Sequence, residues 1–371
     1  MITIIILSRY DSNYLKRALT YYKTLNFKGR IFVADSSTLE DKIKIRAVVK
    51  EFQSDLFYPM LFDYGHEVGF AEKIADVIQK VCTPYVLFAP GDDFFSLEAI
   101  RESMEFLRMN PDYSFVMGYR YGYTYHEDGL LDWYYTGDYD HSKSISHDDP
   151  LERINSYLDR YIATFYSVFR TEILTSVLQK SVLYANDPCT KFFENMITMV
   201  ALLYGKEKYL SIPFSWREQK KSSLGSIYND KWLLDENFEK YEQLMEKGIK
   251  KSLEDIIYLD SVHAGTKSKQ IVQKFIESCF NSLYPIQQKS GFKQSIKQYV
   301  PVYIWNSLKF FKNKKIVTSR TQWSGEHLLY DTKSPFYREF ELVKKLILDS
   351  KMYAYKSGLD DIKILQRADR S

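Results

Sequence analysis

A strand-like run ends in two adjacent aspartates, YVLFAPGDD at residues 85–93. Its apolar residues are typical of a buried strand, and the Pro-Gly pair turns the backbone where that strand ends. Asp92 and Asp93 would then lie where a parallel strand meets its ligand, and their mutual repulsion needs relief by solvent, a base or a divalent cation. Carboxylate oxygens suit Mg²⁺ or Mn²⁺. The alternative interpretation is a solvated turn, because turns are commonly polar for local reasons.

The residues on both sides of this run alternate between strand and helix patterns. Strands are predicted at 3–8, 30–35, 58–64, 85–93, 113–119, 164–170 and 208–214. Helices are predicted at 13–25, 40–53, 72–81, 151–160, 171–178 and 192–204, and residues 120–150 form a long tyrosine-rich excursion. Continuous apolar strands separated by helices predict an α/β fold, with a mainly parallel sheet and helices on both faces.

Polar residues follow three of the predicted strands. They are Ser8, Arg9 and Asp11 after the first strand, Asp35 and Ser36 after the second, and Asp92 and Asp93 after the fourth. In an open parallel sheet, ligands bind beyond the carboxyl ends of the strands. We therefore expect these side chains to form one site at one edge of the sheet.

The composition excludes several classes of protein. The 371 residues are 45% hydrophobic and 27% charged, which is ordinary for a globular chain with room for two domains. A net charge of +3 gives no support for nucleic-acid binding, and three scattered cysteines favour a reducing compartment. The apolar start is too short for a signal peptide, and no stretch approaches the roughly 18 apolar residues of a membrane span. We expect a cytoplasmic protein.

The composition changes after about residue 220. Residues 221–230 are typical of a linker, and helices are predicted at 231–258 and 268–283. Residues 291–315 mix lysines with large apolar side chains, which fits either a packed helical core or an interfacial helix on anionic lipid at the inner face of the cell membrane. Core packing is the favoured interpretation. We predict one domain at 1–220 and a helical region at 221–371.

The order of these pieces resembles the inverting, nucleotide-sugar-dependent glycosyltransferases with a GT-A fold, the family-2 type of bacterial polysaccharide and glycan pathways. The resemblance covers about residues 1–220 and implies that they form the catalytic domain. The helical region at 221–371 would then serve acceptor binding, oligomerisation or membrane association. The resemblance rests on SRYDSNYL at 8–15, VADSS at 33–37, LFAPGDDF at 87–94, Phe193-Glu194 and Trp216-Arg217-Glu218. It implies transfer of a sugar from a nucleotide-diphosphate sugar, with UDP-sugar favoured, to a hydroxyl of a glycan, a polysaccharide or a lipid-linked saccharide.

The same resemblance implies roles for the nucleotide-binding residues. Asp35 would contact the base, and Ser36 and the loop from Ser8 through Arg9 to Asp11 would line the nucleotide pocket. Lys73, on the third predicted helix, is a candidate cation for the phosphates. Asp35 could instead cap its own turn, and Lys73 could be a solvated helix residue.

The remaining roles concern the reaction centre. The resemblance implies that Asp92 and Asp93 lie at the diphosphate-bound Mn²⁺ or Mg²⁺, with Asp93 as the direct ligand. Glu194 would be the general base and Arg217 a further cation. The usual first aspartate of the metal motif falls near Pro90, so the motif departs from the pattern of the family. Glu194 could instead be a first-turn carboxylate facing a helix dipole, and Arg217 could pair with the glutamate that follows it.

Two other functions stay open. A sugar nucleotidyltransferase would use a similar sheet, but residues 8–11 lack the glycine-rich, basic loop that such an enzyme needs. A degenerate transferase domain that serves as a binding or scaffold module in a glycan-assembly complex fits the absent aspartate near Pro90. A homo-oligomer is compatible with either.

Overall fold

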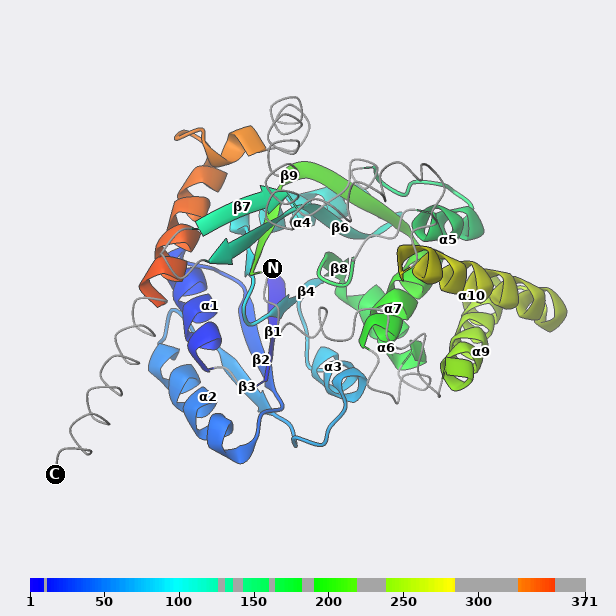
Figure 1. The fold of residues 1–371 in the computed structure, drawn as a ribbon, viewed down its shortest axis with the longest axis horizontal. Coiled ribbons are helices and arrows are strands. Elements are labelled where there is room, and N and C mark those ends of the chain that lie inside the picture. Colours follow the sequence, from blue (N-terminus) through cyan, green and yellow to red (C-terminus); the bar gives the residue numbers. More distant parts are fainter. Residues whose placement is uncertain are drawn as a thin grey trace, which may run out of the picture.

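A mixed, curled β-sheet forms the centre of the molecule (Figure 1). The computed structural model describes residues 1–9, 12–125, 131–135, 143–159, 164–181, 190–218, 238–283 and 326–350. Within these ranges the strands are β1 (Ile2–Ser8), β2 (Arg30–Asp35), β3 (Met60–Asp63), β4 (Tyr85–Pro90), β5 (Phe94–Phe95), β6 (Tyr113–Tyr125), β7 (Leu131–Tyr135), β8 (Val168–Arg170) and β9 (Lys206–Glu218). Their order in the sheet is β3-β2-β1-β4-β8-β6-β9-β5, with β7 paired to β6.

The first half of the sheet is parallel, as predicted. β1 pairs in parallel with β2 and β4, and β2 with β3. These strands are connected through α1 (Ser12–Thr24), α2 (Leu39–Phe52) and α3 (Phe70–Ile78). In the second half, β8 is antiparallel to both β4 and β6, whereas β6 and β9 are parallel. The predicted α/β fold class, with helices on both faces, is confirmed.

Each face of the sheet has its own apolar core. Ile4 and Ile6 of β1 pack on the face covered by α1, α2 and α4 (Leu97–Met109), whereas Ile5 packs on the opposite face. Helices α3, α5 (Pro150–Leu158), α6 (Thr171–Ser181) and α7 (Thr190–Tyr204) cover that opposite face (Figure 1). Since successive side chains of a strand point to opposite faces, a strand buried on both sides reads as a continuous apolar run.

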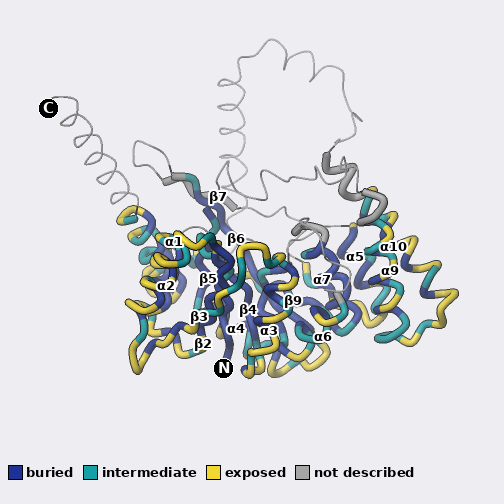
Figure 2. The backbone as a smooth tube through the Cα atoms, turned by 90° about the horizontal axis from the view of Figure 1, so that it is seen from below, coloured by how far each residue is buried: buried dark blue, intermediate teal, exposed yellow. Residues whose placement is uncertain are grey.

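The described C-terminal elements join both cores. Helices α9 (Phe238–Ile257) and α10 (Ser261–Leu283) pack beside α7 at one end of the molecule, far from α2 (Figure 2). The 3₁₀ turn η4 (Glu326–Leu329) and a helix at 335–350 lie at the other side, near α1 (Figure 1). The predicted linker and the 291–315 segment fall outside the described residues, and the division at residue 220 stays a prediction.

Several elements differ from the sequence-based expectation. The strand predicted at 164–170 is formed only at its end, as β8, because residues 164–167 form a turn, and the two-residue β5 was not predicted. The strand predicted to end at residue 119 continues to Tyr125 and pairs with β7, so part of the predicted excursion is a β-hairpin. Helix α4 was not predicted at all. Ser96 is its N-cap, and its hydroxyl accepts a hydrogen bond from the Ala99 amide at 3.1 Å. That cap, followed by an acidic first turn at Glu98, is a sequence signal that would have located the helix.

Membrane spanning has no support among the helices that the structure describes. None of them combines the length and the apolar character that crossing a bilayer requires.

Candidate active site

The polar residues that follow β1, β2 and β4 meet at one edge of the sheet. Ser8 is opposite Asp35 in the β1–β2 pairing, and Leu7, one residue earlier, is opposite Pro90 at the end of β4. The strand-end clusters that the sequence places at this edge are therefore adjacent in space. Arg9 is exposed beside them, whereas Asp11 lies outside the described residues.

Lys73 points from α3 into the polar cluster and is only 3% exposed. Its Nζ donates hydrogen bonds to Ser36 Oγ at 2.9 Å and to the Ser8 carbonyl at 3.4 Å. The pKa of Lys73 is lowered to about 8, chiefly by burial; the charge of Asp35 opposes this and that of Arg9 adds to it. A solvated role for Lys73 is therefore wrong. A buried ammonium beside a strand-end carboxylate is a cation that an anionic ligand would stabilise.

Asp35 caps its own turn and is almost fully buried. Its Oδ1 accepts from the Ser37 hydroxyl at 2.6 Å, and the Ser37 amide donates to Oδ2 at 3.4 Å. The Asp35 carbonyl also accepts from the Tyr64 amide at 2.8 Å, which fixes the turn to the end of β3. The capping interpretation is thus correct as far as it goes. Ser37 thereby orients the Asp35 carboxylate at the carboxyl-end edge of β1 and β2.

The turn after β4 carries the two adjacent carboxylates. The Asp93 amide donates to the Pro90 carbonyl at 3.3 Å, and the Asp93 side chain is 5% exposed while Asp92 is half-buried. Burial first, and the charge of Asp92 second, raise the pKa of Asp93 to about 8. Three arginines, Arg217, Arg120 and Arg17, act in the opposite direction. This carboxyl needs further positive charge nearby to ionise readily at neutral pH.

Two of these arginines lie on neighbouring strands. In the β6–β9 pairing, Arg120 is opposite Ser215 and Gly122 is opposite Arg217, so both arginines are on the same face of the sheet. Both side chains are half-buried. Burial alone would lower the pKa of Arg217, but the charges of Asp93, Tyr166 and Glu194 raise it overall. Sequence reasoning missed Arg120 because it ended the strand one residue before it.

Glu194 lies near the same arginine. Helix α7 begins at Thr190, so Glu194 is its fifth residue and not a first-turn carboxylate, which corrects the helix-dipole alternative. Burial first, and the charge of Glu194 second, raise the pKa of Tyr166 well above its usual value. Arg217, Asp93 and Asp92 also act on Tyr166. Tyr166 is therefore close enough to feel the charges of both Glu194 and the carboxylate turn, and no pattern in the sequence singled it out.

Glu218 forms an ion pair with Arg17, whereas the sequence suggested Arg217 as its partner. Its Oε2 accepts from Arg17 Nη2 at 3.2 Å, in an ion pair with both side chains buried. The alternative in which Arg217 and Glu218 form a local pair is thereby replaced by a contact between β9 and α1.

The set of candidate metal ligands allows a divalent cation but is small. Among the residues that the structure describes, no three His, Cys, Asp or Glu side chains cluster as metal ligands. Asp92 and Asp93 supply adjacent carboxylates, and Mg²⁺ commonly uses one or two carboxylates together with substrate phosphates. The raised pKa of Asp93 fits such a cation, because a nearby positive charge would favour its ionised form.

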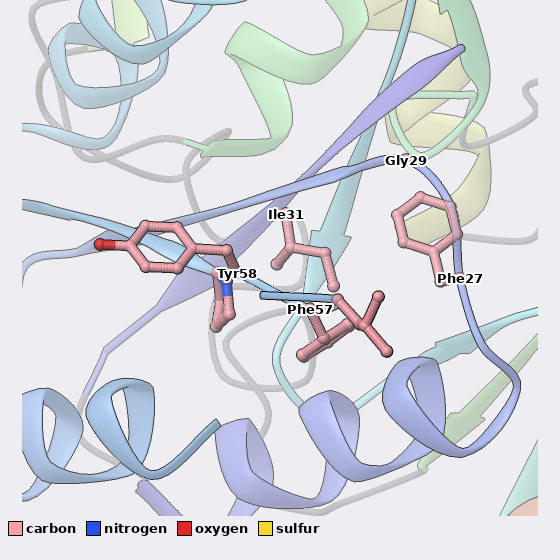
Figure 3. A pocket seen from close by; sticks show the side chains of 7 residues that line it. Phe27, Gly29, Ile31, Phe57 and Tyr58 are labelled. Atoms are coloured by element: carbon pink, nitrogen blue, oxygen red, sulfur yellow. The ribbon is translucent and has the colours of Figure 1, made fainter. Parts of the chain in front are cut away.

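A small cavity of about 40 Å³ lies elsewhere (Figure 3). Its lining includes Phe27, Gly29 and Ile31 around the start of β2, together with Phe57 and Tyr58 before β3. Ligands of open α/β sheets bind at the carboxyl ends of the strands, and this cavity is at the opposite ends. It is therefore separate from the polar cluster.

The comparisons with known proteins concern the fold. No protein-family model and no curated protein matches this sequence. S. aureus TarS 1-349 in complex with UDP-GlcNAc is similar in structure, with a TM-score of 0.51 and 12% identity over 96% of this chain and 92% of that chain. The same TarS fragment alone gives 0.49 at 12% identity, covering 96% and 91%. Mannosyltransferase PcManGT from Pyrobaculum calidifontis in complex with GDP-Man and Mn²⁺ gives 0.41 at 10% identity, covering 94% and 85%. At such identities the likeness is one of fold.

Proposed function

We propose that this protein is a glycosyltransferase that moves a sugar, with inversion, from a nucleotide-diphosphate sugar to a hydroxyl acceptor. The observation that carries the proposal is the meeting of two groups at one sheet edge. One is a buried lysine–serine–aspartate cluster, and the other is a turn with two carboxylates. Nucleotide sugars have a base at one end and a diphosphate next to the sugar, so they need both kinds of group.

The nucleoside half of the donor would bind beside β1, β2 and α3. Asp35 would accept a hydrogen bond from the base, and Ser8, Arg9 and Ser36 would line the pocket. Lys73 would add a buried positive charge that attracts the phosphates. UDP-sugar is our favoured donor class, and the similarity in fold to a structure that contains UDP-GlcNAc supports this choice.

The diphosphate half would bind beside Asp92, Asp93 and Arg217. Asp93, assisted by Asp92, would hold Mn²⁺ or Mg²⁺, which when bound neutralises charge on the diphosphate. Arg217 is held as a cation by the surrounding carboxylates and would donate to the phosphate oxygens as the leaving group gains charge.

Glu194 would act as the general base. Its carboxylate influences Tyr166 and Arg217, which in turn respond to Asp93, so all four groups share one region. A carboxylate there would take the proton from the acceptor hydroxyl while that oxygen attacks the anomeric carbon from the side opposite the leaving diphosphate. Such displacement inverts the anomeric configuration. The acceptor that we propose is a saccharide, free or lipid-linked, in a glycan-assembly pathway.

A thermal-shift screen tests this function. Wild type and Asp93→Ala are heated with UDP, GDP, CMP and their sugar conjugates, each with and without Mn²⁺. We expect one nucleotide to raise the melting temperature in a Mn²⁺-dependent way in the wild type, because a ligand that binds only the native state stabilises it. We expect Asp93→Ala to lose the Mn²⁺-dependent part. If no nucleotide shifts the wild type, the transferase proposal fails and a scaffold function gains support.

A further inference from the structure

Arg17 is a buried cation with three hydrogen-bonded partners from three different elements. It lies in α1 and is 4% exposed. Its Nη2 donates to Glu218 Oε2 at 3.2 Å, to the Tyr123 hydroxyl at 3.1 Å and to the Asp92 carbonyl at 2.9 Å. One guanidinium nitrogen thus connects α1 to the end of β9, to β6 and to the carboxylate turn.

Aromatic rings complete the surroundings of Arg17. Its Cζ lies 4.7 Å from the ring centroid of Tyr14 and 5.1 Å from that of Phe94. Burial alone would lower the pKa of Arg17, but the charges of Tyr123 and Glu218 raise it overall, so the group stays a cation. A guanidinium suits this arrangement because its charge lies over two rings while Nη2 donates, although Nε and Nη1 are buried without a hydrogen-bond partner.

Such a buried ion pair is weak evidence for stability. Removing two charges from water costs roughly what their attraction returns. The arrangement does, however, specify geometry, because the Asp92 carbonyl can accept from Arg17 only when the turn adopts one conformation. Asp93, the next residue, is the carboxylate to which we assign the cation, and Phe94 after it pairs with Trp216 in β9.

Through Glu218, Arg17 also restricts the position of the end of β9. Successive strand residues point to opposite faces, so Glu218 points toward Arg17 while Arg217 points the other way. Both Arg17 and Arg217 act on Asp93. Fixing Glu218 therefore fixes the part of β9 that presents Arg217.

We propose that Arg17 is a positioning residue that holds the Asp92–Asp93 turn and the end of β9 in the geometry that receives the donor diphosphate. This inference rests on the proposed function. Arg17 itself does not touch the donor in this account. It acts through the Asp92 carbonyl on one side and through Glu218 on the other, while the nucleoside pocket of Asp35 and Lys73 is built without it.

The test compares the affinities of the protein for nucleoside monophosphates and nucleoside diphosphates. Wild type, Arg17→Met and Arg17→Lys are titrated by calorimetry with UMP, UDP, GMP and GDP in Mn²⁺, and the base that wild type binds is then used throughout. We expect Arg17→Met to bind the monophosphate within twofold of wild type but the diphosphate about 10- to 100-fold more weakly, as for loss of a group that orients metal ligands. Arg17→Lys keeps the charge for Glu218, but its Nζ ends one bond short of the position of Nη2 and cannot reach all three acceptors, so it should fold like wild type yet still lose diphosphate affinity.

A matched control is Lys16→Met, which removes the neighbouring cation of α1 at a side chain that is 51% exposed. It should leave both affinities unchanged. Unchanged diphosphate affinity in both Arg17 variants, or equal losses for monophosphate and diphosphate in Arg17→Lys, would overturn the positioning role alone. Failure of wild type to bind any of the four nucleotides would overturn the proposed function and this inference together.

Discussion

Among single residues, Asp93 has surroundings that suit a carboxylate bound to a cation better than they suit the same carboxyl without one. Its carboxyl is buried beside Asp92, and its pKa is raised to about 8 because burial and that neighbouring charge outweigh three arginines. In the unfolded chain the same carboxyl would ionise near its ordinary value. The metal-free native state must therefore protonate Asp93 at neutral pH, which costs stability.

Asp93→Asn is accordingly predicted to stabilise the metal-free protein while removing Mn²⁺-dependent binding. The amide is close in size and needs no proton, so the free energy of unfolding at pH 7.5 with a chelator should rise by at least about 1 kcal/mol. Urea denaturation measures this free energy of unfolding. Asp92→Asn, at a half-buried position, is the control and should gain less. A lower stability of Asp93→Asn would mean that the arginines hold Asp93 ionised.

Sequence could identify some site residues and not others. The positions of Ser8, Asp35 and Asp93 were predictable because each lies at or just beyond the end of an apolar strand, and strand ends define the ligand edge of such a sheet. Arg17 and Tyr166 were not. They reach the site from a helix and from a short segment before β8, and only the packing of those elements brings them to the carboxylate turn.

Among the elements, the helix at 335–350 has a specific attachment to α4. Glu339 is 6% exposed, and its Oε1 accepts from the Glu98 amide at 3.0 Å, in the first turn of α4. The Tyr21 hydroxyl donates to Oε2 at 3.4 Å. Burial nevertheless raises the pKa of Glu339 to about 7, although the hydrogen bonds from Ser96 and the α4 amides lower it. Tyr22, buried nearby, is influenced by both Asp93 and Glu339.

This attachment predicts a dependence of stability on pH. Because the pKa of folded Glu339 lies above the ordinary value of 4.5, the native state binds the proton more tightly. The resulting stability is complete below pH 4.5 and is lost as the pH rises to about 7. Glu339→Gln cannot titrate, so its advantage over wild type should grow by about 2 to 3 kcal/mol between pH 5 and pH 8.

Urea denaturation of both proteins across this range measures the difference, in which other titrating groups such as Asp93 cancel. Glu341→Gln serves as the control, since it changes a 43% exposed carboxylate on the same helix. If the difference between wild type and Glu339→Gln stays constant with pH, Glu339 is not the group that titrates.

Element boundaries followed the sequence where a strand is buried on both faces. The strand at 30–35 was predicted with the bounds that it has, because apolar residues on both faces and charged ends define it. Predicted strand 113–119 was too short, since its continuation to Tyr125 consists of alternating tyrosines and small residues that resembled a loop. Tyr121 and Tyr123 are buried, and this continuation pairs with β9, a partner some ninety residues further along the chain.

At the scale of the whole molecule, the parallel half of the sheet and its helices were predictable as βαβ units. The order β8-β6-β9-β5 was not, because it depends on pairings between strands that are far apart in the sequence. The packing of the helix at 335–350 was also unpredictable from the sequence. Phe336 and Phe340 of the helix at 335–350 join the core behind α1, and Phe340 stacks on Trp216 of β9 with ring centroids 6.3 Å apart.

The most direct test of the account as a whole is the turnover of Glu194→Gln. Release of nucleoside diphosphate from the donor sugar that the thermal screen selects is followed in Mn²⁺, with water as acceptor, for wild type, Glu194→Gln and the exposed helix-start control Glu172→Gln. The account predicts that Glu194→Gln binds the donor like wild type but turns over about 10²- to 10⁴-fold more slowly, while Glu172→Gln is unaffected. Equal turnover by wild type and Glu194→Gln would contradict it.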